Sequence, residues 1–154
     1  MILDVVRLFE RVHGHLGWLA VAALVHPAIL LRDPRRRADL SVTLSVALVT
    51  VAAAVGVGLY GSYTGTLKQQ IFLHAPAVGL LFERKEHLAF GAVLLAWTGA
   101  VAYTVDVRRP RAAGAPDALR TALRRLAFHA YVGAAALAAV VATLGTIVAV
   151  YKSF

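Results

Sequence analysis

Three histidines lie in one strongly apolar stretch of this sequence, RVHGHLGWLAVAALVHPAILLR, at positions 11 to 32. The full set of histidines is His13, His15, His26, His74, His87 and His129. An imidazole in apolar surroundings is usually a metal ligand, a proton carrier or a hydrogen-bonding partner of a neighbouring helix. The chain has no cysteine, which excludes disulfides, thiolate metal sites and iron–sulfur clusters. The histidines are therefore the residues whose spacing has to be explained.

The elements that position them are predicted to be membrane helices. The chain has 154 residues, of which 60% are hydrophobic, and its mean hydropathy is +0.72. Its apolar runs are each near the ~20 residues that cross a bilayer as a helix, and they lack the alternation of a β-barrel strand. We expect an all-α, integral membrane four-helix bundle, a single transmembrane domain over 1–154 with spans at about 12–31, 40–60, 87–107 and 126–150. The first run is too long for a signal peptide, so we expect it to remain in the mature protein.

The basic residues predict the orientation of these helices. Ten arginines gather in two segments, RDPRRR (32–37) and VRRPRAAGAPDALRTALRR (107–125), against six basic residues elsewhere. By the positive-inside rule both segments face the cytoplasm, so both termini lie on the outer, periplasmic side of a bacterial inner membrane. The net charge of +8 is explained by this distribution, and we expect no nucleic-acid partner. Residues 62–86 then form an outer loop, which we expect to be an interfacial lid of two short segments broken at Pro76 and Gly79.

Helical geometry and depth pair four of the histidines. His15 and His26 are eleven residues apart, so they differ by only ~20° around a helix and share one face, ~16.5 Å apart along its axis. His87 enters the third span from outside at about the depth of His15. His129 lies one turn inside the fourth span, near the depth of His26. We therefore expect two pairs, His15 with His87 and His26 with His129.

Two imidazoles at one depth on facing helices are the axial ligands that a bis-histidine haem b requires, and two pairs predict two haems. The absence of cysteine excludes a covalently attached c-type haem. Gly91 and Gly133 follow His87 and His129 by four residues and leave room for the macrocycle. Arg84 outside and Arg124 inside are among the cations that we expect near the propionates.

This placement of histidines resembles the four-helix, di-haem b-type membrane cytochromes, such as the cytochrome subunits of formate dehydrogenases and nickel–iron hydrogenases, and bacterial superoxide oxidase. The resemblance covers most of the chain as architecture, and it implies electron transfer across the bilayer, exchange of electrons with quinone or quinol, and possible partner redox subunits. The second span differs from the second helix of several such cytochromes because it carries no histidine.

The outer lid contains a candidate site for quinol oxidation. Ile71, Phe72, Leu80 and Phe82 offer an apolar wall. His74, with an unperturbed pKa of ~6.5, is suited to accept a proton, and Glu83 and Glu86 are placed to pass it outward. The simpler interpretation is that His74 caps the break before Pro76 or binds a lipid headgroup.

Two other functions are open at this stage. One is a small transporter in which the histidines bind a metal ion or relay protons, although the interiors of the spans contain no carboxylate. The other is a structural or assembly subunit of a larger respiratory or photosynthetic complex, since small residues such as those in VAAAVGVG (51–58) favour close helix packing. His13 fits neither histidine pair, and we expect it to face the membrane interface.

Overall fold

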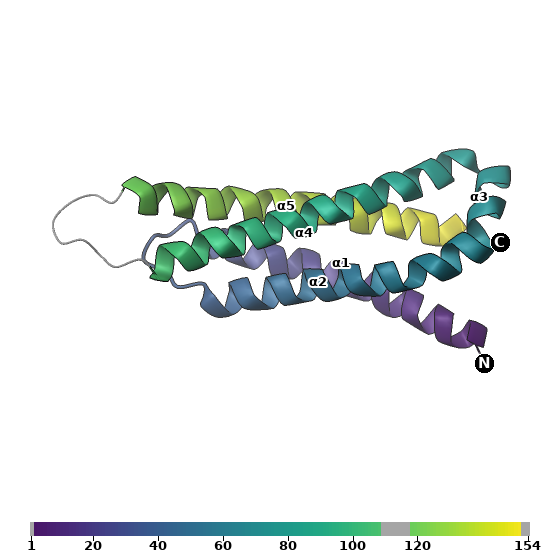
Figure 1. Ribbon diagram of the computed structural model, residues 1–154, viewed down its shortest axis with the longest axis horizontal. Helices are drawn as coiled ribbons and strands as arrows, with labels where there is room; N and C mark the ends of the chain where they lie inside the picture. Colours follow the sequence, from purple (N-terminus) through teal and green to yellow (C-terminus); the bar gives the residue numbers. More distant parts are fainter. Residues whose placement is uncertain (1, 109–117, 152–154) are drawn as a thin grey trace.

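The computed structural model describes residues 2–108 and 118–151 and is an all-α bundle of four long helices (Figure 1). Its elements are α1 (Ile2–Leu30), α2 (Asp39–Ser62), the π-helical turn η1 (Tyr63–Leu67), α3 (Lys68–His74), α4 (Pro76–Arg108) and α5 (Ala118–Tyr151). The start of α1 and the end of α5 lie at the same end of the bundle as α3, here called the α3 end (Figure 1). Residues 31–38 connect α1 to α2 at the opposite end, here called the arginine end. The predicted four-helix bundle is confirmed.

All four long helices are long and apolar enough to cross a bilayer. The candidate spans are Val5–Leu30, Asp39–Gly65, Pro76–Arg108 and Ala118–Val150, with hydropathies between 1.3 and 2.3. With 33 and 34 residues, α4 and α5 are longer than the sequence predicted. A rise of about 1.5 Å per residue makes each about 50 Å long, whereas the hydrocarbon core is about 30 Å thick. Both helices therefore extend beyond the hydrocarbon.

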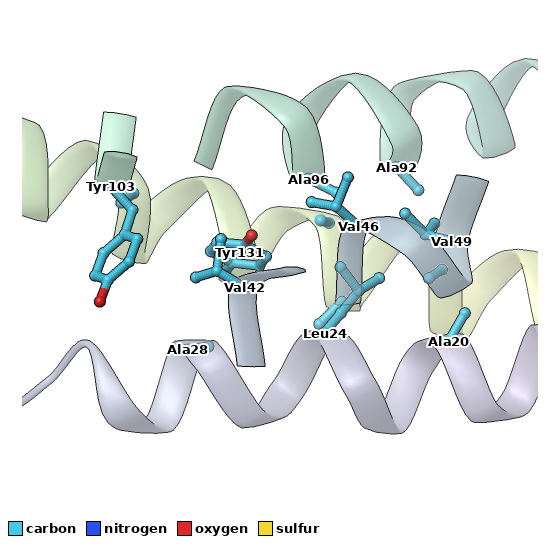
Figure 2. Close-up of a cluster of buried hydrophobic side chains, with 14 of the residues drawn as sticks. Ala20, Leu24, Ala28, Val42, Val46, Val49, Ala92, Ala96, Tyr103 and Tyr131 are labelled. Atoms are coloured by element: carbon cyan, nitrogen blue, oxygen red, sulfur yellow. The ribbon is translucent and has the colours of Figure 1, made fainter. Parts of the chain in front are cut away.

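The helices are arranged so that α1 and α4 are diagonal to each other. Each of these two packs against α2 and α5. Their common core is built around Leu24 and Tyr131, which have no exposed surface. Figure 2 shows Leu24 of α1 beside Val46 of α2, with small side chains around them; the buried alanines of this core include Ala20, Ala28, Ala92, Ala96, Ala127 and Ala134. Small side chains let membrane helices approach closely, and they fill the centre of the bundle with helix backbone and short side chains.

Hydrogen bonds between indole and hydroxyl groups add to this packing. The Trp18 indole of α1 donates to Thr146 Oγ1 of α5 at 3.4 Å. The Trp97 indole of α4 donates to Thr50 Oγ1 of α2 at 3.2 Å. Each bond connects two neighbouring helices, as polar side chains between membrane helices commonly do.

The structure differs from the sequence prediction at residues 62–86. The chain runs without interruption from α2 through η1 into α3, breaks at Ala75, and then enters α4 at Pro76. Proline is well tolerated in the first turn of a helix because its missing N–H has no intrahelical acceptor there. Gly79 does not break the chain but lies inside α4, where the Phe72 ring covers it: a Cβ atom on Gly79 would lie 2.7 Å from that ring. The segment is a helical hairpin continuous with α2 and α4.

This hairpin has a small core of its own. Tyr63 stacks on Phe82 with ring centroids 3.8 Å apart, and the buried cluster also includes Ile71, Val78 and, from α5, Val148. Lys68 and Glu83 form an ion pair at 2.8 Å across the hairpin. The hydrogen bond from Lys68 to Glu83 raises the pKa of the lysine above its usual value.

The arginine end is closed by contacts between the α1–α2 connection and the other two helices. The backbone N–H of Ala38 donates to the Tyr103 hydroxyl at 2.7 Å. Arg124 Nη2 donates to the carbonyl oxygens of Asp33 and Arg36 at 2.7 and 2.8 Å. Residues 31–38 are therefore held against α4 and α5.

Candidate functional site

The four histidines predicted as ligands are all exposed on the surface of the single chain. His15 of α1 and His87 of α4 lie toward the α3 end, on two helices that are diagonal in the bundle. His26 of α1 and His129 of α5 lie toward the arginine end. The predicted common face of His15 and His26 is an outward face of α1, because the buried stripe of this helix consists of other residues, Ala20, Leu24, Ala28 and Leu31.

The ring nitrogens of His15 and His87 share one arrangement. His15 Nδ1 lies 2.7 Å from the carbonyl oxygen of Arg11, and His87 Nδ1 lies 2.8 Å from that of Glu83. A carbonyl oxygen only accepts hydrogen bonds, so the proton of each neutral ring is on Nδ1 and the lone pair is on Nε2. A metal-binding histidine is usually oriented in this way, with its other ring nitrogen bound to a backbone carbonyl.

The two predicted pairs differ in how their helices are placed: those of His15 and His87 (α1 and α4) are diagonal, whereas those of His26 and His129 (α1 and α5) are neighbours. His26 Nδ1 lies 2.8 Å from Ser41 Oγ, so this imidazole is bound to α2. His129, in contrast, lines a cavity at the arginine end to which His26 does not contribute. The donor chemistry of the histidines therefore fits haem iron, whereas a haem enclosed at the centre of this bundle does not fit, because that centre is filled by the side chains around Leu24 and Tyr131.

The two glycines predicted to make room for the macrocycle lie in the contact between α4 and α5. A Cβ atom on Gly91 would lie 3.2 Å from Leu137 Cδ1, and one on Gly133 would lie 3.1 Å from Leu95 Cδ1. Their small size allows these two helices to pack closely. The structure thus gives both glycines a packing role within the chain.

The two arginines predicted near the propionates have different surroundings. Arg84 is exposed on α4. Arg124 is largely buried and binds the backbone of residues 33–36, and its Nη1 lies 3.6 Å from Asp106 Oδ2. Arg124 therefore acts in the closure of the arginine end.

The sequence predicted that His13 faces the membrane interface, and this prediction is wrong. It is half-buried between α1 and α2, and its Nδ1 lies 3.0 Å from the carbonyl oxygen of Ala52. The ring packs against Gly56, where a Cβ atom would lie 2.9 Å from His13 Cε1. Gly56 was the available signal, because a glycine within a membrane helix often marks a close approach. His13 connects two helices and does not face outward.

The predicted quinol residues are divided between the surface and the hairpin core. His74 is exposed at the end of α3, and its Nδ1 lies 2.9 Å from the carbonyl oxygen of Gln70. Glu86 is half-buried on α4. Ile71 and Phe82, predicted as part of an apolar wall, pack inward in the hairpin core.

The described ranges, 2–108 and 118–151, contain no group of three or more His, Asp or Glu residues arranged to hold a metal ion. No protein-family model, no curated protein and no solved structure matches this chain. Its fold and composition define it as a multi-pass, all-α membrane protein with four candidate spans, for which a lipid bilayer is the surrounding medium.

Proposed function

We propose that this chain is a haem b-binding subunit for electron transfer in the membrane, exchanging electrons with quinone or quinol. The observation that carries the proposal is the set of four exposed imidazoles on three membrane helices. Of these, His15 and His87 present Nε2 as the nitrogen available to a metal. Bound haem b would supply one-electron chemistry at a potential set by its axial ligands and surroundings.

The position of two imidazoles within candidate membrane spans supports a ligand role. His26 and His129 lie within candidate membrane spans and are exposed on the isolated chain. A polar or ionisable side chain in a membrane usually faces a partner, a cavity or a ligand. Because His26 Nδ1 is already bound to Ser41, a metal bond to Nε2 would satisfy the remaining polar atom of that ring.

The outward position of the histidines indicates where the haems are bound. Because the bundle centre is filled, we propose that the four exposed histidines, His15, His26, His87 and His129, would hold two haems at the outer surface of the bundle, against a neighbouring chain. The neighbouring chain is a second copy or a partner redox subunit. In this arrangement, the electron-transfer subunit is also part of a larger membrane complex.

The α3 end is the proposed place of quinol oxidation. His74 carries its proton on Nδ1, so Nε2 is the atom that accepts a proton from the quinol hydroxyl. Glu86, near the start of the apolar part of α4, is the next carboxylate that takes up the proton.

Single histidine substitutions test the ligand assignment. We expect His15→Ala, His26→Ala, His87→Ala and His129→Ala each to lower the haem content of the purified protein. His74→Ala is the matched control, since His74 has the same Nδ1 arrangement but is not assigned as a ligand; we expect it to keep the wild-type haem content. Unchanged haem content in all four ligand variants would contradict the assignment.

A further inference from the structure

The arginine end contains a cavity of about 1080 Å³ whose lining is dominated by arginine. Within residues 2–108 and 118–151, the lining contains seven arginines, Arg32, Arg35, Arg36, Arg37, Arg120, Arg124 and Arg125, and one carboxylate, Asp106. They come from three parts of the chain that are distant in sequence: the α1–α2 connection, the end of α4 and the start of α5. The fold therefore concentrates positive charge around one hollow.

Part of this charge is already neutralised inside the protein. Arg120 Nε lies 2.8 Å from Asp106 Oδ1, and Arg124 Nη1 lies 3.6 Å from Oδ2 of the same residue. Arg36 is paired with Asp33 at 3.5 Å. These pairs involve Asp33 and Asp106, and Asp39 at the start of α2 is a third carboxylate at this end, close to the lining residue Tyr103.

A set of four lining arginines has no such neutralisation. Within residues 2–108 and 118–151, no carboxylate lies within 4.0 Å of the guanidinium groups of Arg32, Arg35, Arg37 and Arg125. Like charges at this density repel one another, and this repulsion is relieved when an anion binds between them. The planar fork of a guanidinium group matches the oxygens of a phosphate group.

The wall of the cavity is fixed by hydrogen bonds to residues 33–38. The bond from Ala38 N–H to the Tyr103 hydroxyl and the bonds from Arg124 to the backbone of residues 33–36 fix its wall. Its volume is at the upper end of the ~300–1,000 Å³ that is typical of ligand sites. Leu31, Val107 and Phe128 add apolar surface to the same lining, on the side of the membrane spans. Basic pockets between membrane helices are suited to phosphate-bearing headgroups.

We propose that this cavity binds an anion whose phosphate groups carry more than one negative charge in total. The guanidinium groups of Arg32, Arg35, Arg37 and Arg125 hold this anion. The phosphate is presented either by the headgroup of an acidic phospholipid or by a soluble phosphate compound. This site is independent of the proposed haem ligands in its chemistry, although His129 lies on its edge.

Native mass spectrometry of the full-length protein in detergent tests the proposal. The protein is titrated with cardiolipin, with phosphatidylcholine and with inorganic pyrophosphate. We expect tighter binding of cardiolipin than of phosphatidylcholine if the source is a lipid, or saturable binding of pyrophosphate if the source is soluble. Either result supports the site if it depends on the cavity arginines, and binding of neither anion above the phosphatidylcholine level overturns the proposal.

Two variants show whether binding depends on the cavity. The side chains of Arg35 and Arg37 are exposed and make none of the hydrogen bonds that fix the wall, so R35Q/R37Q leaves the wall intact. Each arginine near a membrane surface adds to the binding free energy of an acidic headgroup. We therefore expect the loss of two arginines to weaken binding of the anion roughly thirtyfold. R108Q is the matched control, since Arg108 is exposed in the last turn of α4 but does not line the cavity; we expect it to weaken binding less than about threefold. Equal weakening by R108Q and by one of the single variants, R35Q or R37Q, overturns the proposal. Wild-type helix content by circular dichroism confirms that each variant is folded.

Discussion

Asp106 is the residue whose substitution most directly tests how the arginine end is held together. Its side chain is buried, with 3% exposure, and it accepts a hydrogen bond from Arg120 Nε at 2.8 Å. Arg124 adds an ion pair at 3.6 Å. Asp106→Asn keeps the shape of the side chain but removes the charge that both guanidinium groups share. We therefore expect this variant to be clearly less stable than the wild type.

The magnitude follows from the burial of the three groups. A hydrogen bond to a charged group contributes about 1.5–3 kcal/mol, and removing one partner of a buried pair costs about 3–5 kcal/mol. The side chains of Arg120 and Arg124 keep 24% and 15% exposure, so water partly compensates for the loss of their partner. We expect Asp106→Asn to lower the free energy of unfolding by about 3 kcal/mol.

The assay is unfolding of the purified protein in mixed micelles by titration with sodium dodecyl sulfate, followed by circular dichroism. Asp33→Asn is the matched control, because Asp33 pairs with Arg36 at 3.5 Å while both side chains are largely exposed. An exposed pair contributes less than about 1 kcal/mol. If Asp106→Asn is no more destabilising than Asp33→Asn, the reasoning about the buried cluster is wrong.

Three further predictions concern packing, orientation and quinol chemistry. Gly99→Ala places a Cβ atom 2.9 Å from the buried Tyr131 ring and should destabilise the bundle by about 1–3 kcal/mol, whereas Gly58→Ala, with no atom within 4 Å, should be neutral or stabilising in the same micelle unfolding assay. Arg36→Cys, the single cysteine in an otherwise cysteine-free chain, should react with an impermeant thiol reagent only from the cytoplasmic side; labelling from outside would reverse the predicted orientation. Glu86→Gln should slow haem reduction by quinol at least about tenfold, or ~1.4 kcal/mol, while keeping the haem content; an unchanged rate would place the quinol site elsewhere.

The existence of the helices was predictable from the sequence, and their rotation was not. Hydropathy alone located four spans, because nearly all residues that cross a bilayer are apolar. Spacing also placed His15 and His26 on one face of a helix. It did not show that this face points outward, because lipid is as apolar as a helix-packed core and leaves no polar face to mark the outside. The signal that orients α1 is the stripe of Ala20, Leu24 and Ala28, whose spacing of four residues places it against the other helices.

The helix boundaries failed for a different physical reason. Pro76 and Gly79 are residues that often end helices, and the sequence therefore predicted a lid broken at both. The break before Pro76 is observed at Ala75, and Pro76 begins α4, where proline is favourable. Gly79 does not end a helix, and it accommodates the Phe72 ring of α3. The contact between Phe72 and Gly79 joins two different helices, so the local spacing of residues does not reveal it. The basic cavity was missed in the same way, because its arginines were attributed to orientation and, for Arg124, to the haem propionates, and their convergence depends on tertiary contacts.

The visible absorption spectrum of the purified protein tests the central claim most directly. Protein produced in a haem-proficient bacterial host, purified in mild detergent and reduced with dithionite, should show the sharp α-band of a low-spin b-type haem. Pyridine haemochrome quantitation should give two haems b per chain. A folded, helical protein that is colourless after such production would contradict the proposal that this chain is a haem-binding electron-transfer subunit.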